Sequence, residues 1–369
     1  MKITHIDVHR VVAPVRPGTV HSAAYHDTTD PSAWSGVDFD QQYKFIYEVH
    51  TNEGIVGLGE SYRGIDERLV QANCKALIGQ NAMKLNWRAL PLPYNRAYDG
   101  FECAVLDLMG KKLGVPVYQL LGGACRDKVQ VDFWCGRQSP EDLRTRMQQA
   151  VQLGYHGIKM KYCWGDPHRE RAMAVEAVGG KDFAMIFDPN MRCHTAANAV
   201  KMAHDLDGFN VTCLEDPIPR WNIEGFRLLR QKIQIPIAFH THLPYGQTLA
   251  EMFACVKQDA ADFYNLSGSV AGVLQMAALA QAAGCPVWHG SEVDLGILEA
   301  AYLHTCAAMP NCTLPSDLFG ELIRVDDFIT QPHEFRRDKD GVYLRVPQGT
   351  GLGVELDRQS LARFTGDPL

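Results

Sequence analysis

The chain has 369 residues, of which 46% are hydrophobic and 21% are charged, and its net charge is −7. These values are ordinary for a globular protein, and the length predicts two domains or one barrel with a cap. Both charge signs are mixed along the chain, with no block of Lys and Arg to hold a phosphate backbone, so the sequence disfavours nucleic-acid binding.

The sequence also argues against a membrane or secreted protein. No apolar run approaches the ~18–20 residues that cross a bilayer. The first residues, MKITHIDVHRVVAP, read as a strand and lack the apolar core of a signal peptide. The 11 cysteines lie within apolar runs and form no CxxC pair. We therefore expect buried free thiols in a cytoplasmic protein.

The first 125 residues predict an α+β capping domain. Two β-rich runs flank the hairpin signal Asn52-Glu53-Gly54. Apolar residues recur at helical spacing from Phe101 to Leu113, and Gly114 ends that run. The loop Gly18–Asp40 is long and contains His21 and Tyr25. A loop of this kind is either disordered or a lid, and as a lid it would bring His21 or Tyr25 to a substrate.

Residues 126–320 alternate short apolar strands with amphipathic helices. Eight predicted strands, from VQVDFWC to NCTLPSD, enclose seven helices, which is the pattern of a (β/α)7β modified TIM barrel. Residues 321–369 contain hairpin-like runs such as DKDGVYLRV. We expect this last segment to pack back on the N-terminal cap.

Polar side chains end the predicted barrel strands, where active sites of barrels lie. The second strand ends in Lys159-Met160-Lys161, so both lysines share one face. Two neighbouring ammonium groups disfavour each other's charge, which lowers the pKa of at least one of them. A lysine of that kind can act as a base near neutral pH, whereas the alternative is a solvated pair at a strand edge.

The next three strands end in candidate metal ligands. Asp188, with Asn190 after it, ends the third strand, and Glu215 ends the fourth. The fifth ends in His240-Thr241-His242. Two carboxylates at one mouth suit Mg²⁺, although each acid alone would read as a helix N-cap.

Three further residues belong to the last strands. Asp262 begins the sixth, His289 ends the seventh and Asp317 follows the eighth. An Asp that holds one imidazole nitrogen leaves the other free to act as a base. A single His or Asp at a strand end is equally a structural polar group.

Together these motifs resemble the enolase superfamily, in its mandelate racemase and muconate-lactonizing branch. FECAVLDLMGKKLGVPVYQLLGG is similar to that family's helix leading into the barrel, and GIVGLGES to its cap loop. Lys159-Met160-Lys161 matches the family's KxK motif, which implies that Lys161 is the base. Asp188 and Glu215 match its first two Mg²⁺ ligands.

The resemblance extends to the last strands and points to dehydratases. The spacing of Asp262 and His289 is that of the His–Asp dyad in racemase-like and dehydratase-like members. PVWHGSEV resembles the strand end of those dehydratases, whereas YNLSGSVAG carries no lysine of the cycloisomerase kind. The third metal ligand departs from the pattern, because His240, or His242, replaces an acid. An imidazole there makes Mn²⁺, Fe²⁺ or Zn²⁺ alternatives to Mg²⁺.

The implied function is metal-dependent removal of the proton next to a carboxylate, through an enediolate. We expect a lyase that dehydrates an acid sugar or small hydroxy acid, with a racemase or epimerase (an isomerase) as the alternative. Asn190, His242, His21, Tyr25 and Asp317 are the expected substrate-binding residues. The missing third acid leaves open a barrel that only binds a ligand. We also expect a homo-oligomer, with a small-molecule carboxylate as its substrate.

Overall fold

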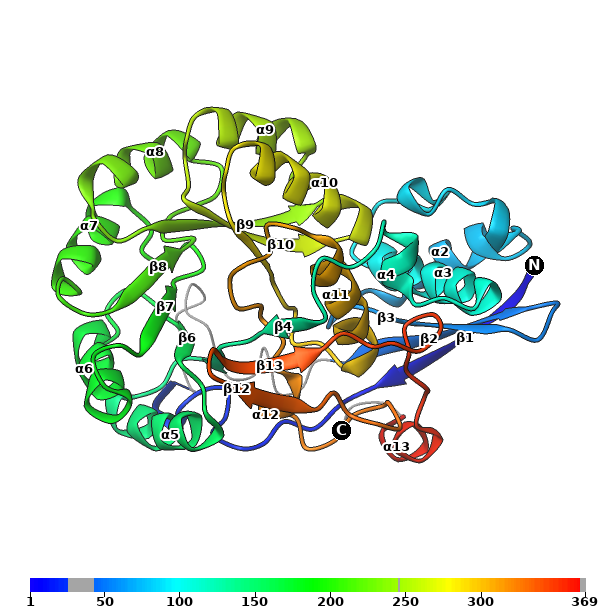
Figure 1. The fold of residues 1–369 in the computed structure, drawn as a ribbon, viewed down its shortest axis with the longest axis horizontal. Helices are drawn as coiled ribbons and strands as arrows, with labels where there is room; N and C mark the ends of the chain where they lie inside the picture. Colours follow the sequence, from blue (N-terminus) through cyan, green and yellow to red (C-terminus); the bar gives the residue numbers. More distant parts are fainter. Residues whose placement is uncertain (26–42, 245, 366–369) are drawn as a thin grey trace.

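The computed structural model describes residues 1–25, 43–244 and 246–365. An α+β cap lies beside a parallel barrel, and the C-terminal segment runs along both (Figure 1). Helices surround the strands of the barrel on the outside (Figure 1). The fold is therefore the capped α/β barrel that the sequence predicts.

The cap is built on a three-stranded antiparallel sheet in the order β1 (Ile3–Val11), β2 (Lys44–Thr51), β3 (Val56–Glu60). The hairpin between β2 and β3 turns at Gly54, whose φ is 76°, so that prediction is confirmed. The cap's helical elements are η1 (Ala23–Tyr25), α2 (Glu67–Leu77), η2 (Ala82–Lys84), η3 (Trp87–Ala89), α3 (Tyr98–Leu113) and α4 (Val117–Leu120).

Helix α3 is the predicted helix that leads into the barrel. It ends as expected at Gly114, which adopts the left-handed conformation with φ of 71°. The helix lies so close to β3 that a Cβ on Gly59 would stand 2.0 Å from the carbonyl oxygen of Gly100. Glycine at this position therefore sets the packing of the cap.

Seven strands form a curled parallel sheet in chain order. They are β5 (Phe133–Cys135), β6 (Gly157–Lys161), β7 (Ala184–Asp188), β8 (Val211–Glu215), β9 (Ile237–Leu243), β10 (Phe263–Gly268) and β11 (Val287–His289). The helices that follow them are α5 (Pro140–Leu153), α6 (His168–Gly179), α7 (Ala196–Asp205), α8 (Ile223–Lys232), α9 (Leu249–Lys257), α10 (Val270–Ala282) and α11 (Gly296–Ala308).

The predicted first and eighth strands need correction. VQVDFWC divides into β4 (Lys128–Gln130), which leaves the barrel, and β5. NCTLPSD contributes only isolated parallel bridges, from Cys312 to Val287 and from Ser316 to Val131. Pro315 has no N–H to donate, so this segment closes the barrel without a regular ladder.

The C-terminal segment contains α12 (Gly320–Ile323), β12 (Phe335–Asp338), β13 (Gly341–Arg345) and α13 (Arg358–Phe364). Strand β13 pairs antiparallel with both β12 and β4 in a third sheet. Thr365 bridges to Val11 of the cap, and the backbone N–H of Leu352 donates to Asp107 of α3, at 2.8 Å. The segment thus contacts both the cap and the first barrel residues.

Two wholly buried carboxylates of the cap hold it to the barrel. Glu102 accepts hydrogen bonds from the backbone N–H groups of Val270 and Ala271 at the start of α10, at 2.5 and 3.2 Å. Glu60 accepts from Leu295 and Leu298 at the start of α11, at 2.8 and 2.9 Å. These groups satisfy helix N-termini that have no intrahelical acceptors.

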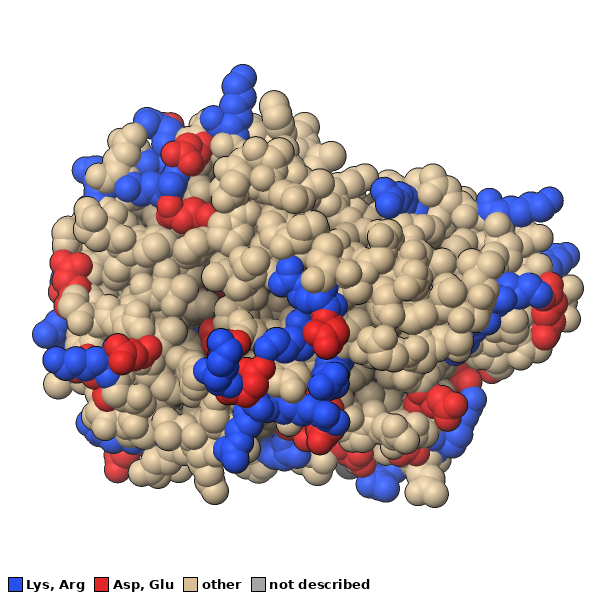
Figure 2. All heavy atoms as spheres, viewed as in Figure 1, with Lys and Arg blue, Asp and Glu red and all other residues tan. Residues whose placement is uncertain are grey.

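Three further features bear on the predictions from composition. All 11 cysteines are free thiols. Within the described residues, no helix is both long and apolar enough to span a bilayer. Basic and acidic side chains are interspersed on the face shown in Figure 2.

Stability should depend on pH through His304, which lies buried in α11. Its Nδ1 accepts from the backbone N–H of Tyr118 and its Nε2 donates to the carbonyl of Leu352, at 3.4 and 3.1 Å. Burial lowers the pKa of His304 to about 4. The unfolded imidazole takes up a proton first, so stability should fall by up to about 3 kcal/mol between pH 6.5 and pH 4.

Urea unfolding at several pH values measures this loss. His304→Gln should make the dependence in that window less steep without abolishing it, because burial also lowers the pKa values of His242 and His289 to about 4. The control His156→Gln changes an exposed imidazole and should keep the wild-type slope. An unchanged slope in His304→Gln would show that His304 does not cause the loss.

Candidate active site

A cavity of about 720 Å³ opens at the carboxyl ends of the barrel strands. This volume is typical of sites for small molecules. Its lining combines strand-end residues with residues of the cap and loops, and it includes Arg63, Arg96, Trp134, Lys159, Lys161, Asn190, Arg192, Arg220, His240, His242, Glu292, Asp317 and Phe319. The cavity is the candidate active site.

Lys159 lies at the centre of the charged groups of the cavity. Its Nζ lies 2.6 Å from Asp317 Oδ2, 2.7 Å from Glu215 Oε2 and 3.5 Å from Asp188 Oδ2. Burial alone would lower the pKa of Lys159, but these three carboxylates together raise it well above its usual value. Lys159 is therefore not the lysine with the lowered pKa that the sequence led us to expect.

Lys161 and Asp188 form the second ion pair of the site. They end β6 and β7 side by side, and Lys161 Nζ lies 2.5 Å from Asp188 Oδ2. Asn190 donates its backbone N–H to Asp188 Oδ1 at 3.0 Å, and its side-chain amide donates to the same oxygen. Although burial opposes it, Lys161 and Lys159 lower the pKa of Asp188 to about 2.

Glu215 ends β8, and His240 lies in the middle of the neighbouring strand β9. Nδ1 of His240 is 3.5 Å from Glu215 Oε1, and its Nε2 hydrogen-bonds Ser267 Oγ at 2.8 Å. Burial, followed by the nearby cations, lowers the pKa of His240 well below its usual value, so the imidazole is neutral. Asn265 donates to Glu215 Oε1 at 2.8 Å.

These donors fit a divalent metal ion in kind. Asp188 and Glu215 are completely buried, and Glu215 Oε2 has the ion pair with Lys159 but no hydrogen-bond partner within the described part of the chain. Burial, followed by the charge of Asp188, raises the pKa of Glu215 to about 8. A neutral His240 adds the nitrogen donor that zinc, manganese or iron accept.

His242 and Glu292 form a second pair, at the rim of the cavity. His242 Nε2 lies 3.7 Å from Glu292 Oε1, and Arg96 from the cap holds the other carboxylate oxygen at 3.2 Å. The pair faces the cavity from β9 and from the loop after β11. Sequence reasoning missed Glu292, because its loop carries no regular pattern.

The expected pairing of Asp262 with His289 is wrong. Asp262 precedes β10, at the opposite end of the barrel strands, where it binds Arg230 at 2.6 Å and the backbone N–H of Ile237 at 2.8 Å. His289 is buried, stacks on Tyr302 at 3.9 Å, and its Nδ1 contacts the carbonyl of Gly290 at 2.7 Å. His289 also does not line the described cavity.

The two residues expected from the lid contact the barrel elsewhere. Nδ1 of His21 accepts from the backbone N–H of Arg137 at 2.7 Å. Tyr25 lies against the guanidinium of Arg137, with 4.3 Å between the ring centre and the carbon. Neither lines the cavity as described, and residues 26–30 of the proposed lid lie outside the described residues.

Four residues of the site were not predicted from the sequence. Asn265 and Ser267 alternate along β10, so their spacing places them on the face that carries the mouth residues. Trp288 donates from its Nε1 to Asp317 at 3.4 Å. Arg220, four residues after Asp216, pairs with it at 2.5 Å.

Two family models match this chain. Residues 19–122 match the N-terminal domain of the mandelate racemase / muconate lactonizing enzyme family, and residues 142–360 match the enolase C-terminal domain-like model. The fold thus occurs in a known class of barrel enzymes. The chain belongs to the mandelate racemase and muconate-lactonizing family of the enolase superfamily.

Relatives with several activities share this architecture. N-succinyl-L-Arg/Lys racemase of Bacillus cereus is 27% identical over 99% of this chain and 98% of its own. D-galactonate dehydratase of Verminephrobacter eiseniae is 27% identical over 84% and 87%. The structure of Pseudomonas fluorescens muconate lactonizing enzyme with muconolactone is 26% identical, covers 99% of both chains and superposes with a TM-score of 0.85.

Removing the charge of Lys159 should destabilise the fold. Lys159→Met would leave Asp317, Glu215 and Asp188 without their shared ammonium, which we expect to cost about 3–5 kcal/mol in metal-free urea unfolding. Asp317→Asn in the same chain should recover at least about 1 kcal/mol, because one of the facing charges is removed. If the two changes simply add, the cluster does not depend on this ion pair.

Proposed function

We propose that the chain removes the proton next to a carboxylate and dehydrates an acid sugar or a small hydroxy acid. The observation that carries this proposal is that Lys161 lines the cavity while the buried acids Asp188 and Glu215 lie behind it, paired with Lys161 and Lys159. The family supports the general reaction, and two relatives are named dehydratases of D-galactonate and D-xylonate. The cavity can enclose a molecule of that size.

Lys161 is the proposed base. Its Nζ reaches the cavity, and its side chain is 12% exposed. Lys159 supplies a positive charge on the same strand face. Asp188, which Asn190 holds in place, positions Lys161 to take the α-proton.

The carboxylate of the substrate would lie beside Asp188, Glu215 and His240. These three residues would hold a divalent ion, Mg²⁺ in the first place and Mn²⁺, Fe²⁺ or Zn²⁺ as alternatives, which supplies positive charge for the enediolate. Lys159 and Asp317 line the same cavity, where the ammonium of Lys159 would attract the carboxylate and Asp317 would accept from a hydroxyl group of the substrate. Asn190 adds an amide that can bind a hydroxyl group of the substrate.

His242 is the proposed hydrogen-bond donor to the leaving hydroxyl, as a neutral imidazole, because burial lowers its pKa to about 4. It replaces His289, which does not line the cavity. Glu292 lies beside its Nε2 and Arg96 fixes Glu292 from the cap, so the imidazole has a defined partner at the rim. We infer that the carboxylate orients this ring, as in other His–carboxylate pairs.

Racemisation is the second candidate, because a pair of opposed proton-transfer groups would also return the proton to the other face. The racemase of Bacillus cereus, similar over the whole chain, favours it. Strand β10, with the sequence FYNLSG, offers no lysine of the cycloisomerase kind. A cytoplasmic location and a homo-oligomer stay predictions.

A screen of acid sugars and small hydroxy acids with Mg²⁺, Mn²⁺ or Zn²⁺ tests the proposal. Dehydration gives a keto acid that semicarbazide detects, whereas racemisation gives deuterium at the α-carbon in D₂O without a keto acid. Metal removal by a chelator should abolish either signal. Tight binding of an acid without turnover or exchange, in a metal-loaded protein, would favour the ligand-binding alternative.

Lys161→Ala should reduce both turnover and α-proton exchange about 10²–10⁴-fold, because the base is absent. Exchange in D₂O followed by NMR measures it directly. Lys181→Ala, at an exposed position outside the barrel mouth, is the control and should keep wild-type rates. Exchange that survives in Lys161→Ala would assign the base to another residue.

His242→Asn and His289→Asn distinguish the two histidines. We expect His242→Asn to lower dehydration about 10²-fold or more while α-proton exchange continues, because the base is intact and the imidazole that binds the leaving hydroxyl is lost. His289→Asn should change stability and leave turnover within a few-fold of wild type. The reverse pattern would restore His289 as the catalytic histidine and contradict the role of His242.

A further inference from the structure

The outer face of the cap sheet carries a row of metal-binding side chains far from the barrel mouth. The sequence His5-Ile6-Asp7-Val8-His9 alternates along β1, so its two histidines and its aspartate share one face. In the antiparallel register His5 lies opposite His50, and Asp7 lies opposite Glu48. Cross-strand pairs of this kind bring side chains within reach of each other.

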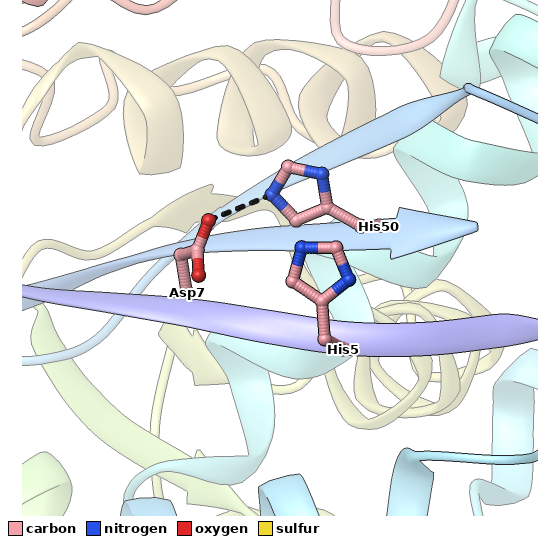
Figure 3. Close-up of side chains that lie close together, drawn as sticks. All are labelled: His5, Asp7 and His50. Atoms are coloured by element: carbon pink, nitrogen blue, oxygen red, sulfur yellow. Dashed lines mark ion pairs between the residues drawn. The ribbon is translucent and has the colours of Figure 1, made fainter.

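Three of these residues converge at one end of the row. The rings of His5 and His50 stack with 4.1 Å between their centres, and Asp7 Oδ2 lies 3.0 Å from His50 Nε2 (Figure 3). One ligand atom from each residue lies within 4.8 Å of the others. Among the described residues this is the one group of three or more His, Cys, Asp and Glu side chains that meets this criterion.

The rest of the row is already paired in a different way. His9 Nε2 contacts Glu48 Oε1 at 2.9 Å, and Arg358 of α13 contacts both oxygens of Glu48. Glu48 is therefore committed to an ion-pair cluster. His5 and Asp7, by contrast, are exposed, so their side chains can turn.

We propose that His5, Asp7 and His50 bind one first-row divalent transition-metal ion, with Zn²⁺ as the reference ion. Two imidazoles and one carboxylate are a ligand set that zinc accepts, with water in the remaining position. The ring planes are 8° from parallel, so binding requires one exposed imidazole to turn about its Cβ–Cγ bond. Mg²⁺ prefers oxygen ligands and should not compete.

Such an ion would join β1 to β2. Strand β1 ends at Val11 and β2 begins at Lys44, so the ion would hold together the two strands on either side of residues 12–43. An ion bound only by the folded pairing stabilises it by mass action. Metal bound by His5, Asp7 and His50 would thus stabilise the β1–β2 pairing independently of the barrel mouth.

The test is a zinc titration of the full chain in saturating Mg²⁺, with calorimetry as the readout of binding. We expect His5→Gln and His50→Gln each to raise the Kd of one zinc equivalent at least tenfold, and Asp7→Asn to raise it less. His9→Gln is the matched control on the same face and should bind zinc as wild type does. Zinc held in the barrel mouth or by thiols should be the same in all four variants.

Two results would overturn the proposal. One is equal zinc stoichiometry and affinity in wild type, His5→Gln and His50→Gln. The other is a loss in His9→Gln as large as that in His50→Gln, which would reflect general surface binding. Electron paramagnetic resonance with Cu²⁺ in place of zinc gives an independent readout, because two nitrogen couplings are expected in wild type and one in His50→Gln.

Discussion

The ammonium of Lys159, enclosed by Asp317, Glu215 and Asp188, is the interaction on which the barrel mouth depends. Three carboxylates cannot share a buried position without positive charge nearby. Lys159 and Lys161 supply two positive charges to this group. Burial, followed by the charge of Asp188, raises the pKa of Glu215 to about 8, so a bound cation would favour its ionised form.

Buried carboxyl groups also fix the cap to the barrel, and the cap completes the site. Glu102 and Glu60 accept from the N-termini of α10 and α11, the helices that follow β10 and β11. A cap fixed at these points brings Arg96 to Glu292, which lies beside His242. Because both carboxylates are fully buried, rotation of the cap would expose helix N-termini and unpaired charge together.

The sequence predicted those parts of the site that follow from strand periodicity and strand order. Lys159, Lys161, Asp188, Glu215 and His240 lie at or towards the carboxyl ends of strands that neighbour each other, so the fold alone brings them together. Asp262 begins its strand instead, and parallel strands place the two ends on opposite sides of the barrel. Its partner, Arg230, lies on α8, and His242 meets Glu292 across a loop. Such pairs depend on side-chain positions that no local pattern encodes.

The sequence resemblance predicts an acid where this chain has His240, and an imidazole there changes what the mouth can hold. A neutral imidazole removes one negative charge where Asp188 and Glu215 already share two lysines. A bound ion would then experience a less negative and softer site, which weakens the preference for Mg²⁺ and favours metals that accept nitrogen. Ser267 bonds Nε2 of His240, so Nδ1 faces Glu215. An outer hydrogen bond of this kind fixes which nitrogen a metal meets.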